Sequence, residues 1–304
     1  MRPLRALGLY IAVVFLGGAL LAPWLYWLAQ SFATEFPKIA GQPFHRFVDR
    51  ALLGLALISL WPLLKSLGAT SAREVGLVSP AGQGRRLAGG LFLGFLSLAV
   101  VAGLTLAIGA RHLNESLTAA RVAERFFTAA LTAVVVAVLE EILFRGGIFG
   151  GLRRVFDWRL ALVASSMIYA IVHFLARTGD PLQVKWFSGF RQLGLMLGGF
   201  ADVHQTVPGF FNLTLAGLLL GLGYQRTRNL YFSMGLHAGW IFWLKSYGAL
   251  TVASSGANQW WWGTSKLVDG WLALPVLVAA LVAFARWPLA NPNRRPGLRE
   301  SLTT

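Results

Sequence analysis

The chain has 304 residues, of which 56% are hydrophobic and only 13% are charged. This composition excludes an ordinary soluble domain, because too few polar side chains are present to cover its surface, and it indicates a membrane protein. The formal charge of +15 comes from cations spread over loops and helix ends, which favours membrane lipids as partners and argues against nucleic acid. The absence of cysteine excludes disulfides, thiolate catalysis and thiolate metal ligands.

Eight apolar segments are long enough to cross a hydrocarbon core of about 30 Å, which takes roughly 18 to 25 helical residues. In chain order they are residues 6–30, 46–67, 86–110, 126–150, 158–177, 207–224, 229–248 and 267–289. The first follows two arginines as a signal peptide would, but it is too long for a signal core, and we expect it to be retained. The predicted fold class is therefore all-α, a polytopic membrane protein with about eight transmembrane helices.

The distribution of arginines predicts the orientation. A cytoplasmic N-terminus places most of them on the inner side, as the positive-inside rule requires. The inner arginines would be Arg73, Arg85, Arg86, Arg153, Arg154, Arg159, Arg226, Arg228, Arg286, Arg294, Arg295 and Arg299. A bacterial inner (plasma) membrane is the expected location, with an endomembrane as the alternative.

Two other features concern how the spans pack. Residues 178–207, between the fifth and sixth spans, contain glycine, proline and several aromatic residues. We expect this segment to lie on the membrane interface or to re-enter the membrane without crossing it.

The glycine pairs Gly90/Gly94 and Gly147/Gly151 are each spaced by four residues, which predicts close approach of helices in lipid.

Among the ionisable residues inside the predicted spans, four stand out, namely Glu140, Glu141, His173 and His237. An unpaired ionisable group costs several kcal/mol in hydrocarbon, so each is a candidate for function. When depth is counted at about 1.5 Å per residue from the cytoplasmic end of each span, Glu140, His173 and His237 fall into one layer, roughly 12 to 22 Å deep. The other histidines, His45, His112 and His204, fall at span edges or in loops, where solvated side chains are expected.

The two adjacent carboxylates are expected to differ in role. On a helix, Glu141 and Arg145 are i,i+4 neighbours that can pair, whereas Glu140 points about 100° away. One carboxylate can then be structural while the other faces a cavity. The structural alternative is a compensated charge cluster that only holds helices together.

A carboxylate and two imidazoles in one low-dielectric pocket can carry out general acid–base chemistry. The carboxylate takes a proton from water, and an imidazole orients the water or protonates the leaving amine. A further donor would stabilise the oxyanion of a tetrahedral intermediate. Peptide hydrolysis inside the bilayer uses all of these groups.

Three motifs follow one another inside apolar spans: Glu140-Glu141-Ile-Leu-Phe-Arg145, Tyr169-Ala-Ile-Val-His173 and His237-Ala-Gly-Trp-Ile241. They resemble the Glu-Glu-x-x-x-Arg, Phe-x-x-x-His and His-x-x-x-Asn motifs of the CAAX prenyl endopeptidase and bacteriocin-processing (Abi, CPBP) family of intramembrane proteases. That family includes the Ras-converting enzyme and lysostaphin resistance protein A-like proteins. The resemblance covers about residues 125 to 245, and three ordered motifs make it fairly specific.

The resemblance implies a role for each residue. Glu140 would activate the attacking water together with His173, and His237 would help to form the oxyanion hole. The supporting residues would be Glu141, Arg145 and Tyr169. Three parts of the chain are expected: N-terminal transmembrane helices at 1–124 with about three spans, the catalytic core at 125–248, and a last helix with a basic tail at 249–304.

Two positions depart from the family pattern. Tyr169 replaces phenylalanine, which is a mild change. Ile241 replaces the asparagine that the family uses as a second oxyanion donor, and isoleucine cannot donate a hydrogen bond. The loss of one such donor typically costs about 100- to 1,000-fold in rate.

The expected activity is therefore that of an intramembrane endopeptidase with a glutamate-activated water and no cofactor. Its substrate would be a membrane-associated or lipidated protein or peptide. If zinc were used, Glu140, His173 and His237 would be its ligands, although the chain has no His-Glu-x-x-His sequence. A non-catalytic membrane scaffold or bacteriocin-immunity protein is the alternative, which Ile241 favours. A proton-coupled transporter is a third possibility, but no inverted repeat is evident.

Overall fold

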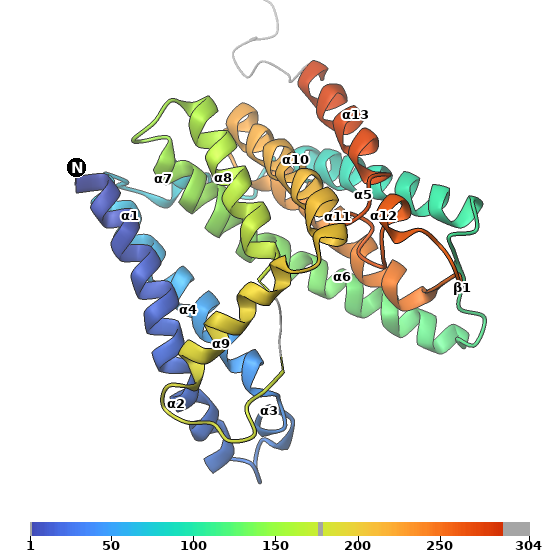
Figure 1. Cartoon of the computed structure of the whole chain (residues 1–304). Coiled ribbons are helices and arrows are strands. Elements are labelled where there is room, and N and C mark those ends of the chain that lie inside the picture. The colour runs from blue at the N-terminus through green and yellow to red at the C-terminus, as the bar shows by residue number, and fades with distance from the viewer. Residues whose placement is uncertain (1, 176–178, 288–304) are drawn as a thin grey trace, which may run out of the picture.

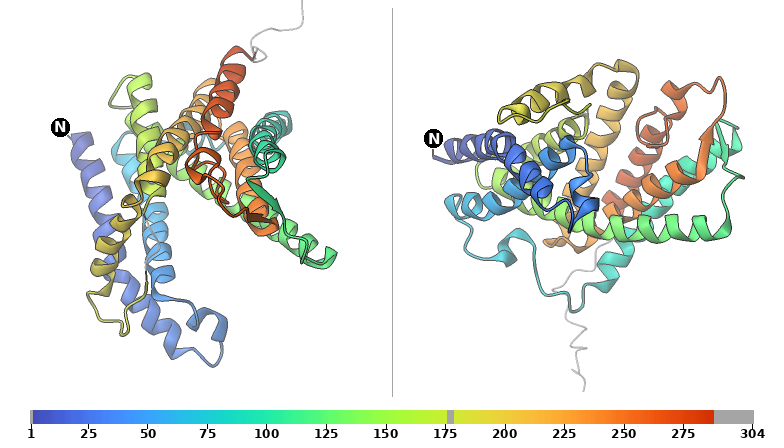
Figure 2. Two further views of the ribbon diagram at one scale, coloured as in Figure 1. Left: turned by 45° about the vertical axis from the view of Figure 1, so that its right-hand side comes forward. Right: turned by 90° about the horizontal axis from the view of Figure 1, so that it is seen from below.

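The structure is a computed structural model that describes residues 2–175 and 179–287. The long helices lie in two groups (Figure 1), with α1, α2, α4 and α9 in one group and α5, α6, α10, α11 and α13 in the other. Helix α8 packs on α10, and the two groups diverge when the molecule is turned (Figure 2). The predicted basic tail, which holds Arg294, Arg295 and Arg299 near the C-terminal end, lies outside the described residues.

The helical elements, in chain order, are α1 (Arg2–Ala12), the π-helix η1 (Val13–Gly17), α2 (Gly18–Ser31), α3 (Pro37–Ala40), α4 (Phe44–Ser66), the 3₁₀-helix η2 (Ala72–Val75), α5 (Gly84–Ala107), α6 (Ala119–Glu141), the π-helix η3 (Ile142–Phe149), α7 (Gly150–Leu152), α8 (Trp158–His173), α9 (Ser188–Met196), the 3₁₀-helix η4 (Leu197–Phe200), α10 (Val203–Thr227), α11 (Tyr231–Leu250), α12 (Gln259–Trp262) and α13 (Ala273–Arg286). In the described part of the chain, the strands are β1 (Arg111–Leu113) and β2 (Thr251–Ala253), which pair antiparallel with Arg111 opposite Ala253. The chain is an all-α polytopic membrane protein, as predicted.

Each predicted span overlaps a helix, but not every helix meets the criteria for crossing a membrane. Within residues 2–175 and 179–287, five helical segments are long and apolar enough: Arg5–Ser31, Phe44–Ser66, Gly84–Ala107, Ala119–Leu152 and Val203–Thr227. Helices α8 and α13 are apolar but shorter. Helix α11 has 20 residues and is not among the five. Many of its side chains are buried, because it packs along both α5 and α6.

The last predicted span, 267–289, begins six residues before the helix α13, which starts at Ala273. Residues 267–272 precede α13, and the amides of Trp271 and Leu272 donate to the carbonyls of Trp260 and Trp261. These hydrogen bonds hold the segment in an irregular loop, which apolar composition alone does not reveal. The predicted interfacial segment between the fifth and sixth spans contains α9, which packs on α2.

Glycines allow α5 and α11 to pack backbone against backbone. A Cβ atom at Gly94 would lie 2.1 Å from the carbonyl oxygen of Leu236, and one at Gly235 would lie 2.0 Å from that of Leu87. Gly90 makes a similar contact with Phe232, so the close approach predicted for the Gly90/Gly94 pair is confirmed. This contact fixes the register of α11 at the residue that precedes His237.

Candidate active site

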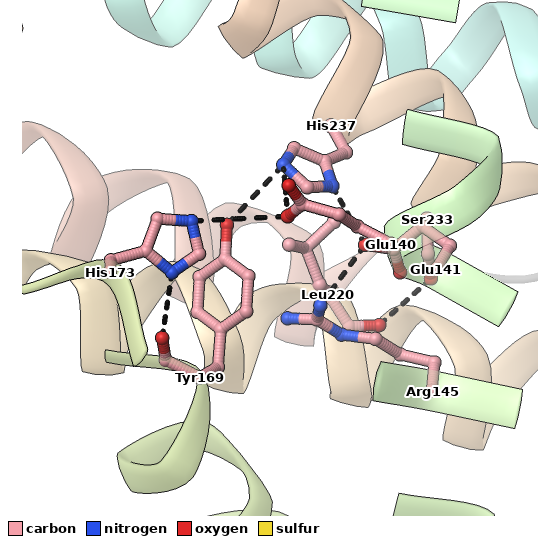
Figure 3. Close-up of polar contacts among 8 residues, drawn as sticks. All are labelled: Glu140, Glu141, Arg145, Tyr169, His173, Leu220, Ser233 and His237. Carbon is pink, nitrogen blue, oxygen red and sulfur yellow. Dashed lines mark hydrogen bonds and ion pairs between the residues drawn. The ribbon is translucent and has the colours of Figure 1, made fainter. Parts of the chain in front are cut away.

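The six residues predicted to form the site come together where α6, α8 and α11 meet (Figure 3). Glu140 and Glu141 are the last two residues of α6, and the π-helix η3 follows them directly. A π-helical turn is rare and wider than an α-turn, and such turns often occur at functional sites. Tyr169 and His173 come from the last part of α8, and His237 lies in the first half of α11.

The inner part of the site is a chain of buried charged groups. Arg145 Nη1 lies 3.0 Å from Glu141 Oε1, and His237 Nδ1 lies 2.8 Å from the same oxygen. The side chain of Glu141 is fully buried, and those of Arg145 and His237 are nearly so. A buried carboxylate is tolerated only when it is paired and hydrogen-bonded, and Oε1 has both kinds of partner. Glu141 Oε2 has no hydrogen-bond partner among the described residues. The spacing of Glu141 and Arg145 predicted their ion pair, and the structure contains it.

The hydrogen bond to Glu141 fixes the tautomer of His237. An ionised carboxylate only accepts hydrogen bonds, so neutral His237 carries its proton on Nδ1 and presents a lone pair at Nε2. His173 is fixed in the same way, because its Nδ1 lies 2.7 Å from the backbone oxygen of Tyr169. Both imidazoles therefore turn unprotonated Nε2 atoms toward Glu140 when they are neutral.

Glu140 forms the outer part of the site. Its Oε2 lies 3.8 Å from Nε2 of His173 and 3.8 Å from Nε2 of His237, which is too long for a hydrogen bond. Among the described groups, no donor lies within hydrogen-bond distance of this buried oxygen. The side chains of Glu140 and His173 are 26% and 30% exposed, whereas that of His237 is 5% exposed. Glu140 and His173 are thus the more exposed members of this charged cluster.

Tyr169 contacts both parts of the site. Its hydroxyl oxygen lies 3.3 Å from His237 Nε2, and its ring centroid lies 4.2 Å from that of His173. The guanidinium carbon of Arg145 sits 4.5 Å from the centre of the Tyr169 ring, a cation–π contact. Sequence reasoning gave Tyr169 only a supporting role, and its link to His237 joins residues 68 positions apart.

Close packing of α8 and α10 holds Tyr169 and His173 in place. A Cβ atom at Gly217 of α10 would lie 2.8 Å from the Cα atom of Ser166 on α8. The hydroxyl of Ser233 on α11 donates to the carbonyl of Leu220 on α10 at 2.8 Å (Figure 3). Helix α10 therefore supports both α8 and α11, although it supplies none of the predicted site residues.

Ile241 lies one helical turn beyond His237, on the side of α11 that faces α6. It is buried in an apolar cluster with Ala133 and Ala137. The position at which the family pattern has asparagine is thus part of an apolar helix contact in this chain.

The arrangement does not fit zinc well. Ligand atoms around a tetrahedral zinc lie about 3.3 Å apart, given Zn–N distances of roughly 2.0 Å, whereas both imidazole nitrogens lie 3.8 Å from Glu140 Oε2. Among the described residues, no group of three or more His, Cys, Asp or Glu side chains is arranged to hold a metal ion. Metal independence stays a prediction, which a chelator tests.

Comparison with known proteins gives one family match. No curated protein and no solved structure matches the chain. Residues 122–243 match the family described as type II CAAX prenyl endopeptidase Rce1-like. This range runs from α6 to α11 and includes all three motifs, so the match confirms the resemblance that the motifs indicated. Residues 122–243 thus form an Rce1-like domain of the CAAX prenyl endopeptidase family.

Proposed function

We propose that this chain is an intramembrane endopeptidase in which Glu140 activates a water molecule. The family of residues 122–243 supports a peptidase at the level of the family. The observation that carries the finer proposal is the meeting of three hydrogen-bond acceptors. The Nε2 atoms of His173 and His237 each lie 3.8 Å from Glu140 Oε2.

Glu140 Oε2 has no donor within hydrogen-bond distance among the described groups, and the Tyr169 hydroxyl reaches His237 Nε2 only at 3.3 Å, so the arrangement calls for a further donor beside Glu140. A water molecule supplies two donor protons, one for Glu140 Oε2 and one for an imidazole Nε2. It would then lie beside the carboxylate, with an oxygen lone pair directed away from its three neighbours. That is the geometry in which a water molecule can attack a carbonyl carbon.

Hydrolysis then proceeds in two steps. The water oxygen bonds to the peptide carbonyl carbon, one water proton passes to Glu140, and the carbonyl π electrons move onto the oxygen to give an oxyanion. When the tetrahedral intermediate collapses, the C–N bond breaks, and its electron pair stays on nitrogen. Glu140 returns its proton to that nitrogen, so the products are a carboxylic acid, which then ionises, and a free amine.

The buried pair of Glu141 and Arg145 would hold His237 rather than react. Glu141 accepts the Nδ1 proton of His237 at 2.8 Å, which fixes the ring orientation and keeps Nε2 directed at the reaction centre. Arg145 compensates the charge of Glu141.

The proposed substrate is a membrane-associated protein or peptide. Glu140 and His173 are partly exposed and would meet it first. The family description names CAAX prenyl substrates, so a prenylated C-terminal peptide is the first candidate, with unprenylated membrane peptides as the comparison.

The test is hydrolysis of a panel of prenylated and unprenylated fluorogenic peptides by the purified protein. Wild type is compared with Glu140→Ala and His173→Ala, with and without a chelator. We expect cleavage by the wild type that both substitutions abolish and the chelator leaves unchanged. If the chelator abolished cleavage by the wild type, the reaction would instead depend on a metal.

A non-catalytic scaffold is the second candidate, and Ile241 is the observation that favours it. In that case the imidazoles would be protonated and paired with Glu140, so that the cluster holds α6, α8 and α11 together. Glu140→Ala would then lower the thermal stability of the protein, and the wild type would cleave no peptide. If Glu140 is instead catalytic, we expect the thermal stability of Glu140→Ala to match that of the wild type.

A further inference from the structure

The oxyanion of the proposed reaction needs a hydrogen-bond donor, and neutral His237 does not supply one. Its proton is on Nδ1, where Glu141 accepts it at 2.8 Å. The atom that His237 presents to the reaction centre is therefore the acceptor Nε2. Ile241, one turn further along α11, is buried against alanines and has no polar group.

The hydroxyl of Tyr169 is a neutral donor beside this centre. It lies 3.3 Å from His237 Nε2 and points toward the space between His173, His237 and Glu140 (Figure 3). An O–H···N contact of this length is at the weak end of the hydrogen-bond range, so the hydroxyl can turn to a better acceptor at small cost. A developing oxyanion is such an acceptor, because hydrogen bonds to ionised groups are roughly twice as strong as neutral ones.

The ring that carries this hydroxyl is held rigidly. Tyr169 is 3% exposed, and its ring meets that of Phe144 edge to face at 5.1 Å. The guanidinium of Arg145 lies over the ring at 4.5 Å. Its positive charge favours the negative charge that moves onto the phenol oxygen when the O–H group donates. A donor that is already in place needs no reorganisation during the reaction, which is the condition for strong oxyanion stabilisation.

We propose that Tyr169 is a catalytic residue that donates a hydrogen bond from its hydroxyl to the oxyanion of the tetrahedral intermediate. The inference rests on the proposed peptidase function. The hydroxyl keeps its proton throughout: it turns from His237 Nε2 to the oxyanion, and it returns when the carbonyl re-forms and the C–N bond breaks. In this chain, a phenol therefore supplies a donor that position 241 does not.

The experiment compares Tyr169→Phe with wild type in purified, lipid-reconstituted protein. The matched control is Tyr10→Phe, which removes a hydroxyl that donates to the carbonyl of Ala56 at 3.0 Å between α1 and α4, outside the site. We measure kcat and KM on a peptide that the wild type cleaves, and the dissociation constant of its phosphinate analogue, whose charged oxygen mimics the oxyanion. Tyr169→Phe should lower kcat about 100-fold with little change in KM, and should weaken phosphinate binding by a similar factor. Tyr10→Phe should leave all three quantities close to wild type.

Two results would overturn the inference while leaving the peptidase proposal intact. One is a kcat of Tyr169→Phe within about threefold of wild type, because this decrease is far smaller than the expected loss of about 100-fold. The other is a lowered kcat with unchanged phosphinate affinity, which would mean that the tyrosine only positions its neighbours. If the wild type cleaves no peptide and does not bind the phosphinate, both proposals fail together. Thermal unfolding of each variant is measured as well, so that a misfolded variant is recognised before its kcat and phosphinate affinity are interpreted.

Discussion

At the scale of single residues, the site contains two adjacent carboxylates in different environments, one fully buried and one partly exposed. Glu141 is fully enclosed and shares one oxygen between Arg145 and His237. Glu140, its neighbour in the chain, is partly exposed and has no close donor among the described residues. One helical step thus distinguishes a buried, paired carboxylate from a partly exposed one, as the 100° rotation per residue predicts.

Breaking the buried pair should be costly. In Arg145→Met, the charge of Glu141 loses its compensation in a low-dielectric interior, so we expect a loss of stability of about 3 to 5 kcal/mol. Arg154→Met is the matched control, because Arg154 pairs with Glu74 at 2.7 Å on the exposed surface, where an ion pair contributes about 0 to 1 kcal/mol. Thermal unfolding in detergent compares the two variants. Equal destabilisation would contradict the importance that we assign to the buried pair.

At the scale of elements, the position of His237 depends on how α11 packs against its neighbours. The hydrophobic pattern predicted the helices, and the four-residue glycine spacing predicted close approach of another helix at Gly90 and Gly94, but not that this helix is α11. They could not predict that His237 meets Glu141, because these residues are 96 positions apart and meet only through the packing of α6 on α11. The π-helix after Glu141 was also not predicted, since the sequence Ile142–Phe149 is equally compatible with an α-helix.

A side chain at Gly94 should disturb the site from a distance. In Gly94→Ala, the added Cβ atom would lie 2.1 Å from the carbonyl oxygen of Leu236, so α5 or α11 must shift and carry His237 with it. We expect a loss of stability of about 1 to 3 kcal/mol, as for an overpacked core, together with lower peptidase activity. Gly103→Ala on the same helix has nothing within 4 Å of its Cβ atom and should behave like wild type. Normal stability and activity of Gly94→Ala would show that this contact does not set the register.

The loop that contains η2 is joined to the loop after α7 through a surface carboxylate. Hydrogen bonds from the side chains of Thr70 and Arg154 lower the pKa of Glu74 below its ordinary value of 4.5. A lowered pKa in the folded state means that Glu74 stabilises the fold above pH 4.5 and loses this contribution as the pH falls through its folded pKa. The stability advantage of wild type over Glu74→Gln should therefore be present at neutral pH and shrink below pH 4.5. An advantage that grows on acidification would contradict this assignment.

At the scale of the whole molecule, composition and hydropathy were sufficient to predict an all-α polytopic membrane protein. The eight predicted spans correspond to helices, because each apolar run must satisfy its own backbone in lipid. The short β1–β2 pair, the packing of α9 on α2 and the late start of α13 were not predicted. They depend on contacts between distant segments, which no local pattern contains. The predicted orientation, with a cytoplasmic N-terminus, stays a prediction.

The central claim is that Glu140 activates the water that cleaves a peptide bond. The most direct measurement is mass spectrometry of the products formed in ¹⁸O-labelled water by the lipid-reconstituted protein. Wild type and Glu124→Gln, which changes an exposed carboxylate on the same helix, should both give a product whose new carboxylate contains the label. Glu140→Gln should form this product at least about 1,000-fold more slowly, in line with the loss of a general base. Labelled product formed by Glu140→Gln at the wild-type rate would contradict the account.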